Sequence, residues 1–482
     1  MRLKLMPYPA YKDSGIPWLG DVPEHWGSLP GVALFHEKQV KNLGMTEKQV
    51  LSLSYGRIVV KPLEKLHGLV PESFETYQVV DPGDIIIRST DLQNDWTSLR
   101  VGIVRDRGII TSAYLRLKTR GTLTPDYGYQ LLHAFDLMKV FYGLGSGLRQ
   151  NLSFLDFKRM PIFFPPLDEQ TAIVKFLDYM DRRIRRYIRA KQKLIKLLEE
   201  QKRAIIHLAV TRGLDPEVRL KPSGVEWLGD VPEHWGVRRL RNIAEMRVSN
   251  VDKLTSDVEH LVRLCNYVDV YKNDRITDQI SFMLATATSD EIERFRLKIG
   301  DLLITKDSEA WNDIGVPSLV ECSAPDLVCG YHLALLRPHR KLLKGGYGLY
   351  ALQIHSIAYQ FHVRANGVTR FGLSQNAIKD VKIPVPPLDE QAAIVRVIDD
   401  ATANINATIS HTKQEISLLG EYRTRLIADV VTGKLDVREA AARLPDEQRE
   451  SALLDEENTL VIDDEFEYSD ADLGSDLEEV EA

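Results

Sequence analysis

The chain contains the sequence PPLDEQTAIVKFLD at residues 165–178 and repeats it, as PPLDEQAAIVRVID, at residues 386–399. A second repeated motif precedes each of these. It reads SGIPWLGDVPEHWG at residues 14–27 and SGVEWLGDVPEHWG at residues 223–236, with twelve of fourteen positions identical. Two pairs of motifs at offsets of 221 and 209 residues indicate an internal duplication. The chain is therefore two copies of one structural unit.

Each PPLDEQ motif begins a long segment with helical character. Residues 167–212 contain neither Gly nor Pro, and residues 389–433 contain one internal glycine, Gly420, before the last residue. Asp168 is the expected N-cap of the first helix, because a short acidic side chain suits the positive end of a helix dipole. We therefore predict two helices, each roughly 60 Å long at ~1.5 Å per residue.

Apolar residues recur every three or four positions along both predicted helices. They are Leu177, Met180, Ile184, Tyr187, Leu194, Leu198 and Ile205 in the first helix, and Ile398, Ile405, Ile409, Ile416, Leu419, Leu426 and Val430 in the second. This heptad pattern predicts an antiparallel coiled coil with internal pseudo-twofold symmetry. The alternative is that each helix packs on its own domain or on another protein. Candidate spacer or subunit-docking residues are Leu177, Ile184, Leu198, Ile398, Ile405 and Leu419.

The segments between the repeated motifs predict α+β domains. The β-rich run GDIIIR at residues 83–88 matches GDLLIT at residues 300–305, and helices are expected at Tyr127–Tyr142 and Tyr347–Val363. Elsewhere the two domains differ in sequence, and the second is longer by 12 residues. A duplicated frame with unlike contents suits the recognition of an asymmetric, two-part target.

Charge is unevenly distributed along the 482 residues. The whole chain has a net charge of −7, but residues 450–482 hold 14 Asp and Glu and no Lys or Arg, so that residues 1–449 carry +7. Such an acidic tail is typical of solvated, disordered sequence. It is either a solubility tail or an arm that competes with nucleic acid for a basic surface.

Composition argues against several protein classes. No apolar run approaches the ~18–20 residues that a membrane span needs, and the N-terminus has no apolar signal-peptide segment. Three cysteines in a chain of this length suit a reducing compartment, so we expect a cytoplasmic protein that does not bind membranes.

The sequence lacks familiar catalytic motifs. We find no P-loop, no methyltransferase tetrapeptide, no HExxH and no nucleophile elbow. Cys322, Cys329, His332 and His339 are spaced more loosely than zinc ligands usually are, so no metal site is expected. His25 and its repeat His234 are better explained by a structural aromatic turn than by general-base catalysis. These features predict no catalytic residues, and they favour a binding or organising role.

As a set, the two PPLDEQ helix starts, the two PEHW motifs and the two GD(I/L)(I/L)I strands resemble the specificity subunit of type I restriction–modification systems, over nearly all of residues 11–440. The resemblance implies two target-recognition domains that each read one half of a split double-stranded DNA sequence. It implies helical spacers that fix the gap between the half-sites. It also implies docking of two methyltransferase subunits, which use S-adenosylmethionine, and of motor–endonuclease subunits, which use ATP and Mg²⁺. The chain itself is then noncatalytic and binds none of these cofactors.

The resemblance also suggests domain boundaries. They are an N-terminal motif at 1–27, target-recognition domain 1 at 28–166, a central helical spacer at 167–215, the repeated motif at 216–236, target-recognition domain 2 at 237–387, a C-terminal helical spacer at 388–436 and an acidic tail at 437–482.

Candidate DNA contacts are basic residues in polar loops, because Arg and Lys read base edges and hold phosphates. They are Arg57, Lys61, Arg88, Arg100 and Arg149 in the first domain, and Arg247, Lys272, Arg275, Lys306, Arg364 and Arg370 in the second. Nearby aromatics are Tyr55, Trp96, Tyr267 and Trp311. For each residue the alternative is a solvated surface charge or a core aromatic. Arg149 and Arg370 precede matching Leu–Ser pairs, and a shared position suits a phosphate contact or support of the fold.

The first helix is unusually basic, with ten Lys and Arg against three Asp and Glu between residues 181 and 203. A solvated face, a phosphate-tracking surface and a docking face for methyltransferase subunits all fit this pattern. Two other functions also remain open at this point: a standalone nuclease with an unrecognised site, and a protein scaffold that does not bind DNA.

Overall fold

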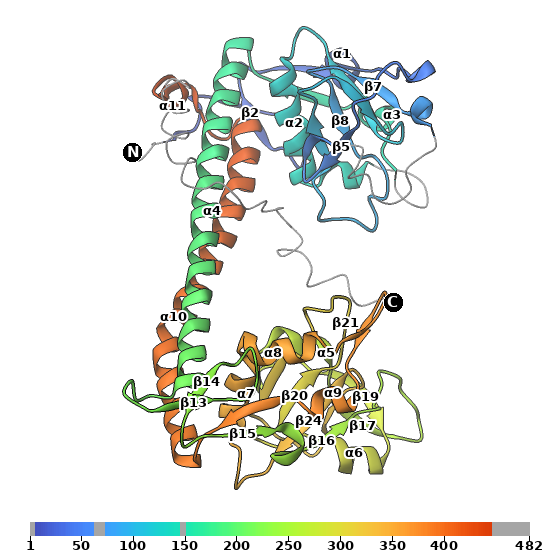
Figure 1. The fold of residues 1–482 in the computed structure, drawn as a ribbon. Coiled ribbons are helices and arrows are strands. Elements are labelled where there is room, and N and C mark those ends of the chain that lie inside the picture. Colours follow the sequence, from blue (N-terminus) through green and yellow to red (C-terminus); the bar gives the residue numbers. More distant parts are fainter. Residues whose placement is uncertain (1–4, 62–72, 145–150, 446–482) are drawn as a thin grey trace. The chain divides into compact units, whose positions relative to one another are not determined.

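The computed structural model describes residues 5–61, 73–144 and 151–445 (Figure 1). The chain divides into two compact units. Unit 1 comprises Met1–Lys191 and Lys413–Ala482, and unit 2 comprises Gln192–Thr412. Helices α4 (Leu167–Arg212) and α10 (Leu388–Val431) each contribute one part to both units. Unit 1 is therefore built from the first and last parts of the chain.

Both units contain a central sheet with corresponding strand order. In unit 1 the order is β4 (Phe35–Glu37), β11 (Leu115–Thr119), β8 (Ile85–Ile87) and β9 (Val101–Ile103), and all neighbours are antiparallel. In unit 2 it is β16 (Ala244–Val248), β24 (Leu333–Pro338), β20 (Leu302–Thr305), β22 (Pro317–Val320) and a short parallel edge strand, β18 (Arg275–Ile276). The matched GD(I/L)(I/L)I motifs form β8 and β20, and every residue of these two strands is buried.

Smaller elements surround these sheets. Unit 1 adds the pairs β1 (Tyr11–Asp13) with β2 (Asp21–Pro23), β3 (Gly27–Pro30) with β12 (Pro161–Phe164), β5 (Leu51–Ser54) with β6 (Arg57–Val60), and β7 (Gln78–Val80) with β10 (Gly108–Ile110), and helices α1 (Gly31–Leu34), α2 (Pro125–Leu137), α3 (Phe154–Phe157) and α11 (Arg438–Ala442). Unit 2 adds β13 (Leu220–Pro222) with β14 (Asp230–Pro232), β15 (Gly236–Arg239) with β27 (Lys382–Val385), β19 (Met283–Ala287) with β17 (His260–Cys265) and β23 (Leu327–Cys329), β21 (Asp307–Ser308) with β26 (Phe371–Gly372) and β25 (Asn366–Gly367), and helices α5 (Tyr267–Lys272), α6 (Ser289–Phe295), α7 (Gly345–Gln353), α8 (His355–His362) and α9 (Gln375–Lys379).

Both predicted domain helices are interrupted. The first, expected at Tyr127–Tyr142, ends at Leu137 because Lys139 adopts a left-handed backbone conformation with φ 59°. The second, expected at Tyr347–Val363, is broken into α7 and α8 at Ile354, whose ψ of 137° is extended. Burial of the Ile354 side chain holds this break in the core of unit 2.

The two long helices are antiparallel and pack together, as predicted (Figure 1). Within unit 1, Asp181 pairs with Arg423 and Lys191 pairs with Glu415, so residue numbers rise along α4 as they fall along α10. The apolar core of each unit includes side chains from both helices. The predicted α+β class with an antiparallel helical pair is confirmed. Within the described residues, neither these helices nor any other could span a bilayer.

The seam between the helices differs in part from the heptad prediction. Leu177, Ile184, Ile398 and Ile405 are buried, and Leu198 and Leu419 are partly buried. Tyr187 and Leu194, however, are 48% and 42% exposed, so their assignment to the seam was wrong. Ile188 is buried instead. The buried residues Leu177, Ile184 and Ile188 are separated by seven and then four positions, so the buried stripe departs from the predicted spacing after Ile184.

This shift of the seam is testable with adjacent substitutions in unit 1. Ile188→Ala should lower the free energy of unfolding by about 2 kcal/mol, since it removes buried methyl groups and leaves a cavity. Tyr187→Ala should cost less than about 0.5 kcal/mol, as expected for an exposed site. Urea denaturation of the two variants measures the difference, and equal losses would contradict the seam described here.

The structure explains why PEHW and PPLDEQ occur together. Glu169, in the first turn of α4, is 3% exposed and accepts hydrogen bonds from Trp26 Nε1 at 2.9 Å and from Tyr8 Oη at 2.6 Å. The Nε2 atom of His25 lies 2.8 Å from the same carboxylate. The duplicated carboxylate of Glu390 contacts Trp235 Nε1 and His234 Nε2 in the same way, at 3.1 and 2.8 Å. The PEHW motif thus docks on the helix that the PPLDEQ motif begins.

The glutamine of PPLDEQ ties the same helix start to the recognition domain. Gln170 accepts a hydrogen bond from the backbone N–H of Thr124 at 2.9 Å and donates to the carbonyls of Thr122 and Pro165. Gln391 makes the corresponding three bonds in unit 2. Asp168 lies inside α4, which begins at Leu167, so the prediction that it is the N-cap was wrong.

Candidate DNA interface

A long surface loop follows the shared strand of unit 1. Residues 88–100 connect β8 to β9, which are antiparallel neighbours at the edge of the sheet. The loop begins immediately after three buried isoleucines, so its base is fixed by the core. Asp91 has a left-handed backbone with φ 60°, a conformation that Asp tolerates better than most residues.

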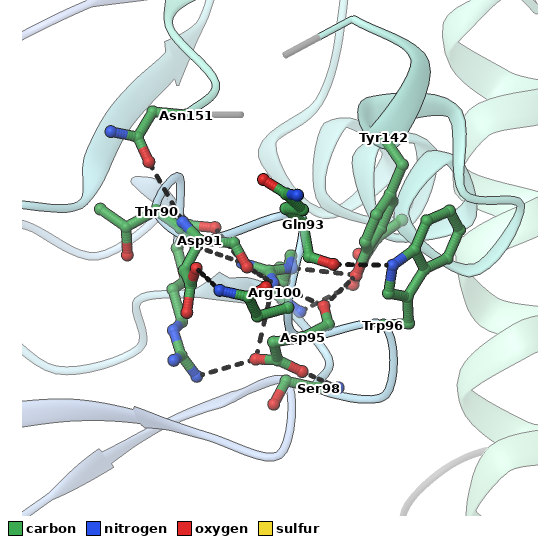
Figure 2. Close-up of polar contacts among 12 residues, drawn as sticks. Thr90, Asp91, Gln93, Asp95, Trp96, Ser98, Arg100, Tyr142 and Asn151 are labelled. Carbon is green, nitrogen blue, oxygen red and sulfur yellow. Dashed lines mark hydrogen bonds and ion pairs between the residues drawn. The ribbon is translucent and has the colours of Figure 1, made fainter. Parts of the chain in front are cut away.

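The buried side chain of Arg100 holds this loop in place through hydrogen bonds (Figure 2). Its side chain is fully buried, and its Nη1 and Nη2 atoms donate to the backbone carbonyls of Arg88, Thr90, Asp91 and Asp95 at 2.6–3.3 Å. Its Nε atom donates to Tyr142 Oη at 3.0 Å. All five N–H donors of the guanidinium group therefore serve the protein itself. Four carbonyls from one loop held by one rigid fork fix the loop in a single conformation.

Ion pairs of Asp95 add to the hydrogen bonds that hold this loop. The Asp95 carboxylate lies 3.5 Å from Arg100 Nη2 and 3.3 Å from Arg88 Nη1. Burial opposes ionisation of this carboxyl, but hydrogen bonds from Ser98 and the charges of Arg100 and Arg88 lower the pKa of Asp95 below its ordinary value. Asp95 is thus ionised at neutral pH and pulls both arginines toward the loop.

The outer face of the loop carries groups suited to base contacts. Gln93, Asn94 and Trp96 are exposed, and the Trp96 ring stacks on Tyr142 with centroids 4.5 Å apart (Figure 2). The Asn94 amide donates to Asp91 Oδ1 at 2.9 Å. Amide side chains are suited to paired hydrogen bonds with adenine in the major groove. The loop therefore presents exposed amide groups on a base that Arg100 holds in place.

The matched Leu–Ser segments hold the base of each loop. The backbone N–H of Leu152 donates to the carbonyl of Ser89, and that of Leu373 donates to the carbonyl of Lys306, both at 2.8 Å. Asn151 Oδ1 also accepts from the N–H of Asp91 at 3.1 Å. The matched segments therefore support the loops in both units.

The corresponding loop of unit 2 follows β20 and is built differently. Asp307 accepts from Lys306 Nζ and lies beside His332 Nδ1, both at 2.9 Å, and Lys306 Nζ lies 4.7 Å from the centre of the Tyr331 ring. Although burial opposes ionisation, the bonds to His332 and Lys306 lower the pKa of Asp307. Trp311 is 50% exposed, close to the 54% of Trp96. The two loops thus occupy equivalent places with unlike side chains.

The predicted DNA contacts fall into several environments. Exposed residues are Arg57, Lys61, Lys272 and Arg370; partly exposed residues are Arg88, Arg247, Arg275, Lys306 and Arg364. The pairing of β21 with β26 places Lys306 opposite Leu373, whereas Arg370 lies at the other end of this short ladder. Arg247 is bound to Glu245 and to the carbonyl of Arg294. Arg149 lies outside the described residues.

Two predicted contacts do not fit a DNA surface. Arg100 is buried with every donor in use, so it supports the loop and does not reach a base or phosphate. Arg275 pairs with Asp399 of α10 at 2.7 Å and also with Glu321, which binds it inside unit 2. Both positions illustrate that a polar loop sequence alone does not distinguish surface charges from internal ones.

Gln93, Asn94 and Asn312 are further candidates, which the sequence analysis did not name because it considered charged residues and aromatics. All three are exposed on the loops that follow the shared strands. Their position after the GD(I/L)(I/L)I motif, beside the exposed Trp96 and Trp311, is the signal that could have identified them. Within the described ranges, no group of three His, Cys, Asp or Glu residues is placed to hold a metal ion.

Comparison with known proteins agrees with this geometry. The family described as type I restriction modification DNA specificity domain matches residues 83–197 and 232–418, more than half of the chain. A protein of Methanocaldococcus jannaschii, provisionally named type I restriction enzyme MjaX specificity subunit, is 26% identical over 213 residues, which cover 42% of this chain and 47% of that protein. This chain thus spans about half the length of that relative.

Two further similarities extend over more of the chain. The type I restriction enzyme MjaVIII specificity subunit of the same organism is 21% identical over 361 residues, covering 74% of this chain and 81% of that protein. A solved structure, described as the structural basis of complex assembly and conformational transition of the type I R-M system, superposes with a TM-score of 0.61 at 16% identity over 85% of this chain and 98% of that chain. The second similarity shows a shared fold.

Proposed function

This chain belongs to the type I restriction modification DNA specificity domain family, as the sequence resemblance predicted, and from this premise we propose that it is the specificity subunit of a type I restriction–modification complex. It reads a split, asymmetric DNA sequence through its two recognition domains and carries out no catalysis itself. The observation that carries the proposal is the pair of equivalent sheets, each of which ends in a rigid loop of different sequence.

The two unlike loops account for asymmetry of the target. The first loop presents Gln93 and Asn94 above the buried Arg100, whereas the second presents Asn312 near Trp311. The net charge of +7 on residues 1–449 favours a polyanionic partner. The boundaries 28–166 and 237–387 for the recognition domains, and 167–215 and 388–436 for the helical spacers, are part of this proposal.

The proposed partners follow from the same premise. The chain docks two methyltransferase subunits and the motor–endonuclease subunits of a type I complex, and these partners use S-adenosylmethionine, ATP and Mg²⁺. The basic stretch of α4 between residues 181 and 203 is the proposed docking or phosphate-facing surface.

Mapping of methylated adenines tests the proposal directly. DNA from cells that express this chain with its methyltransferase subunits should carry methylation at one split motif with two unlike halves and a fixed gap. That motif should disappear when the chain is deleted. An unsplit motif, or methylation that persists after deletion, would refute the proposed role.

Single substitutions on the two loops should each change base preference in only one half of the target sequence. Gln93→Ala should relax base choice in one half of the motif by about 1–3 kcal/mol, the usual value of a good base contact. Asn312→Ala is the matched variant and should relax the other half only. Binding competition with DNAs mutated in either half measures both effects, and a loss that is uniform over all sequences would indicate that Gln93 does not read bases.

A further inference from the structure

Unit 1 contains a polar cavity, and Arg57 is the one candidate DNA contact among its lining residues. It encloses about 290 Å³ between α2, α4, α10 and the β5–β6 hairpin. The charged and polar residues that matter for its chemistry are Arg57, Arg105, Gln130, His133, Asp178 and Arg423.

The internal repeat identifies the residues of unit 2 that correspond to the cavity-lining residues of unit 1. The buried Tyr–Gly pairs at Tyr127 and Tyr347 align α2 with α7 at an offset of 220, and the PPLDEQ motifs align the long helices at an offset of 221. The matched positions are Gln130 with Tyr350, His133 with Gln353, Asp178 with Asp399 and Arg423 with Lys202.

In unit 2, two adjacent residues of the recognition domain occupy the region that corresponds to the cavity. The guanidinium group of Arg275 pairs with Asp399 at 2.7 Å and donates to Tyr350 Oη at 3.2 Å. The carboxylate of Asp274 accepts from Gln353 Nε2 at 2.9 Å and from Lys202 Nζ at 3.3 Å. All four matched positions therefore bind either a guanidinium group or a carboxylate.

In unit 1 the same positions face the cavity. The described side-chain hydrogen bond to Asp178 is a long one, 3.5 Å from Gln130 Nε2, and burial together with nearby Asp126 raises the pKa of the Asp178 carboxyl to about 6. His133 is 3% exposed, and its Nδ1 atom has no hydrogen-bond partner within the described chain. The matched groups of unit 2 are bound by Arg275 and Asp274, so the weakly bound Asp178 carboxyl and the unpartnered His133 Nδ1 leave room for a ligand of the same chemistry.

We propose that this cavity binds a ligand that carries a guanidinium group together with a carboxylate, the two groups that Arg275 and Asp274 supply in unit 2. The guanidinium group lies against Asp178 and Gln130. The carboxylate faces His133 and Arg423, the matches of Gln353 and Lys202, which bind the Asp274 carboxylate in unit 2.

The excess of positive charge among the cavity-lining residues favours a ligand that carries a carboxylate as well as a guanidinium group. Four arginines line the cavity (Arg57, Arg105, Arg185 and Arg423) against two aspartates, Asp178 and Asp181. Asp181 pairs with Arg185 and Arg423, and Arg105 pairs with Asp126, but Arg57 makes no ion pair within the described residues. A ligand with only a positive group would be repelled by this excess. An Asp–Arg segment of a partner protein supplies this pair of charges alone, and free arginine supplies both groups together with an α-ammonium group.

Calorimetric titration of the full chain tests this proposal. L-Arginine should bind saturably at one site, and Asp178→Asn should weaken binding at least tenfold because the guanidinium group loses its carboxylate partner. L-Citrulline has a neutral group of the same shape and should bind at least tenfold more weakly than arginine. Tighter binding of N-acetyl-Asp-Arg-amide than of arginine would identify a protein segment as the source, and the reverse order would identify the free amino acid.

The second unit provides the matched control. The double substitution Asp274→Ala and Arg275→Ala vacates the equivalent region, so the titration should then show two arginine sites in place of one, and arginine should raise the melting temperature of this variant more than that of the parent chain. Absence of saturable binding by both arginine and the dipeptide, equal binding of citrulline, or unchanged binding to Asp178→Asn would each overturn the proposal.

Discussion

Replacement of Arg100 by Leu should lower the free energy of unfolding by about 3–5 kcal/mol, a large effect for one residue on a surface loop. The substitution leaves four loop carbonyls and Tyr142 Oη without their donors, and it leaves the partly buried Asp95 with a less favourable ion pair to Arg88 alone. Each unpaired buried group costs about 1–3 kcal/mol, although some will regain water as the loop loosens.

The same substitution should abolish specific binding to one half-site. The loop presents Gln93 and Asn94 at fixed positions only because Arg100 holds its backbone. Competition with DNAs altered in one half or the other should therefore show loss of discrimination at a single half. Recognition through the loop after β20 should persist, since Lys306 and Asp307 do not depend on Arg100.

Two variants separate loop order from general loss of stability. Arg88→Leu removes a partly exposed partner of the same Asp95 and should cost less than about 1 kcal/mol, as exposed ion pairs do. Arg100→Lys keeps the charge but cannot satisfy four carbonyls, so the domain should remain folded while half-site discrimination falls. Equal losses of stability in Arg88→Leu and Arg100→Leu would show that Arg100 does not organise the loop.

The duplication made the framework predictable from sequence. Motifs repeated at offsets of 209 and 221 residues predicted two units, and segments after PPLDEQ without Pro and with Gly420 as the single internal Gly predicted the two long helices, because both signals are local and strong. The pairing of Glu169 with Trp26 was not predicted, since 143 residues separate them and an acidic residue at a helix start already has a local explanation. The breaks at Lys139 and Ile354 also escaped prediction, because packing fixes them.

The candidate site was less predictable than the fold. The sequence analysis identified basic loop residues, but whether an arginine faces solvent or the core depends on which carbonyls and carboxylates lie near it. Arg100 and Arg88 belong to one loop, yet the first is fully buried and the second is 37% exposed. The asymmetry between Asp178, which faces a cavity, and Asp399, which binds Arg275, likewise depends on the unlike parts of the recognition domains.

Removal of the Glu169 side chain should give the second large effect, a loss of about 3–5 kcal/mol in the stability of unit 1. The Glu169→Ala variant leaves the buried donors Trp26 Nε1 and Tyr8 Oη unpaired and removes the acceptor beside His25. It also weakens the contact between the two ends of the unit, because Arg438, which follows α10, lies 3.9 Å from Glu169 and 5.2 Å from the centre of the Tyr8 ring. The N-terminal segment should therefore exchange its amide hydrogens faster.

Glu390→Ala provides a matched control, because Glu390 contacts the same types of residue as Glu169 but is more exposed to solvent. The Glu390 side chain is 26% exposed against 2% for Glu169, and its described partners are Trp235 and His234 alone. Water can replace part of what it loses, so the cost in unit 2 should be about 1–2 kcal/mol. Hydrogen exchange resolved around Trp26 and Trp235 measures the two units in one experiment. Equal losses would mean that the duplicated motif contributes equally in both units and that closure between Tyr8 and Arg438 adds nothing.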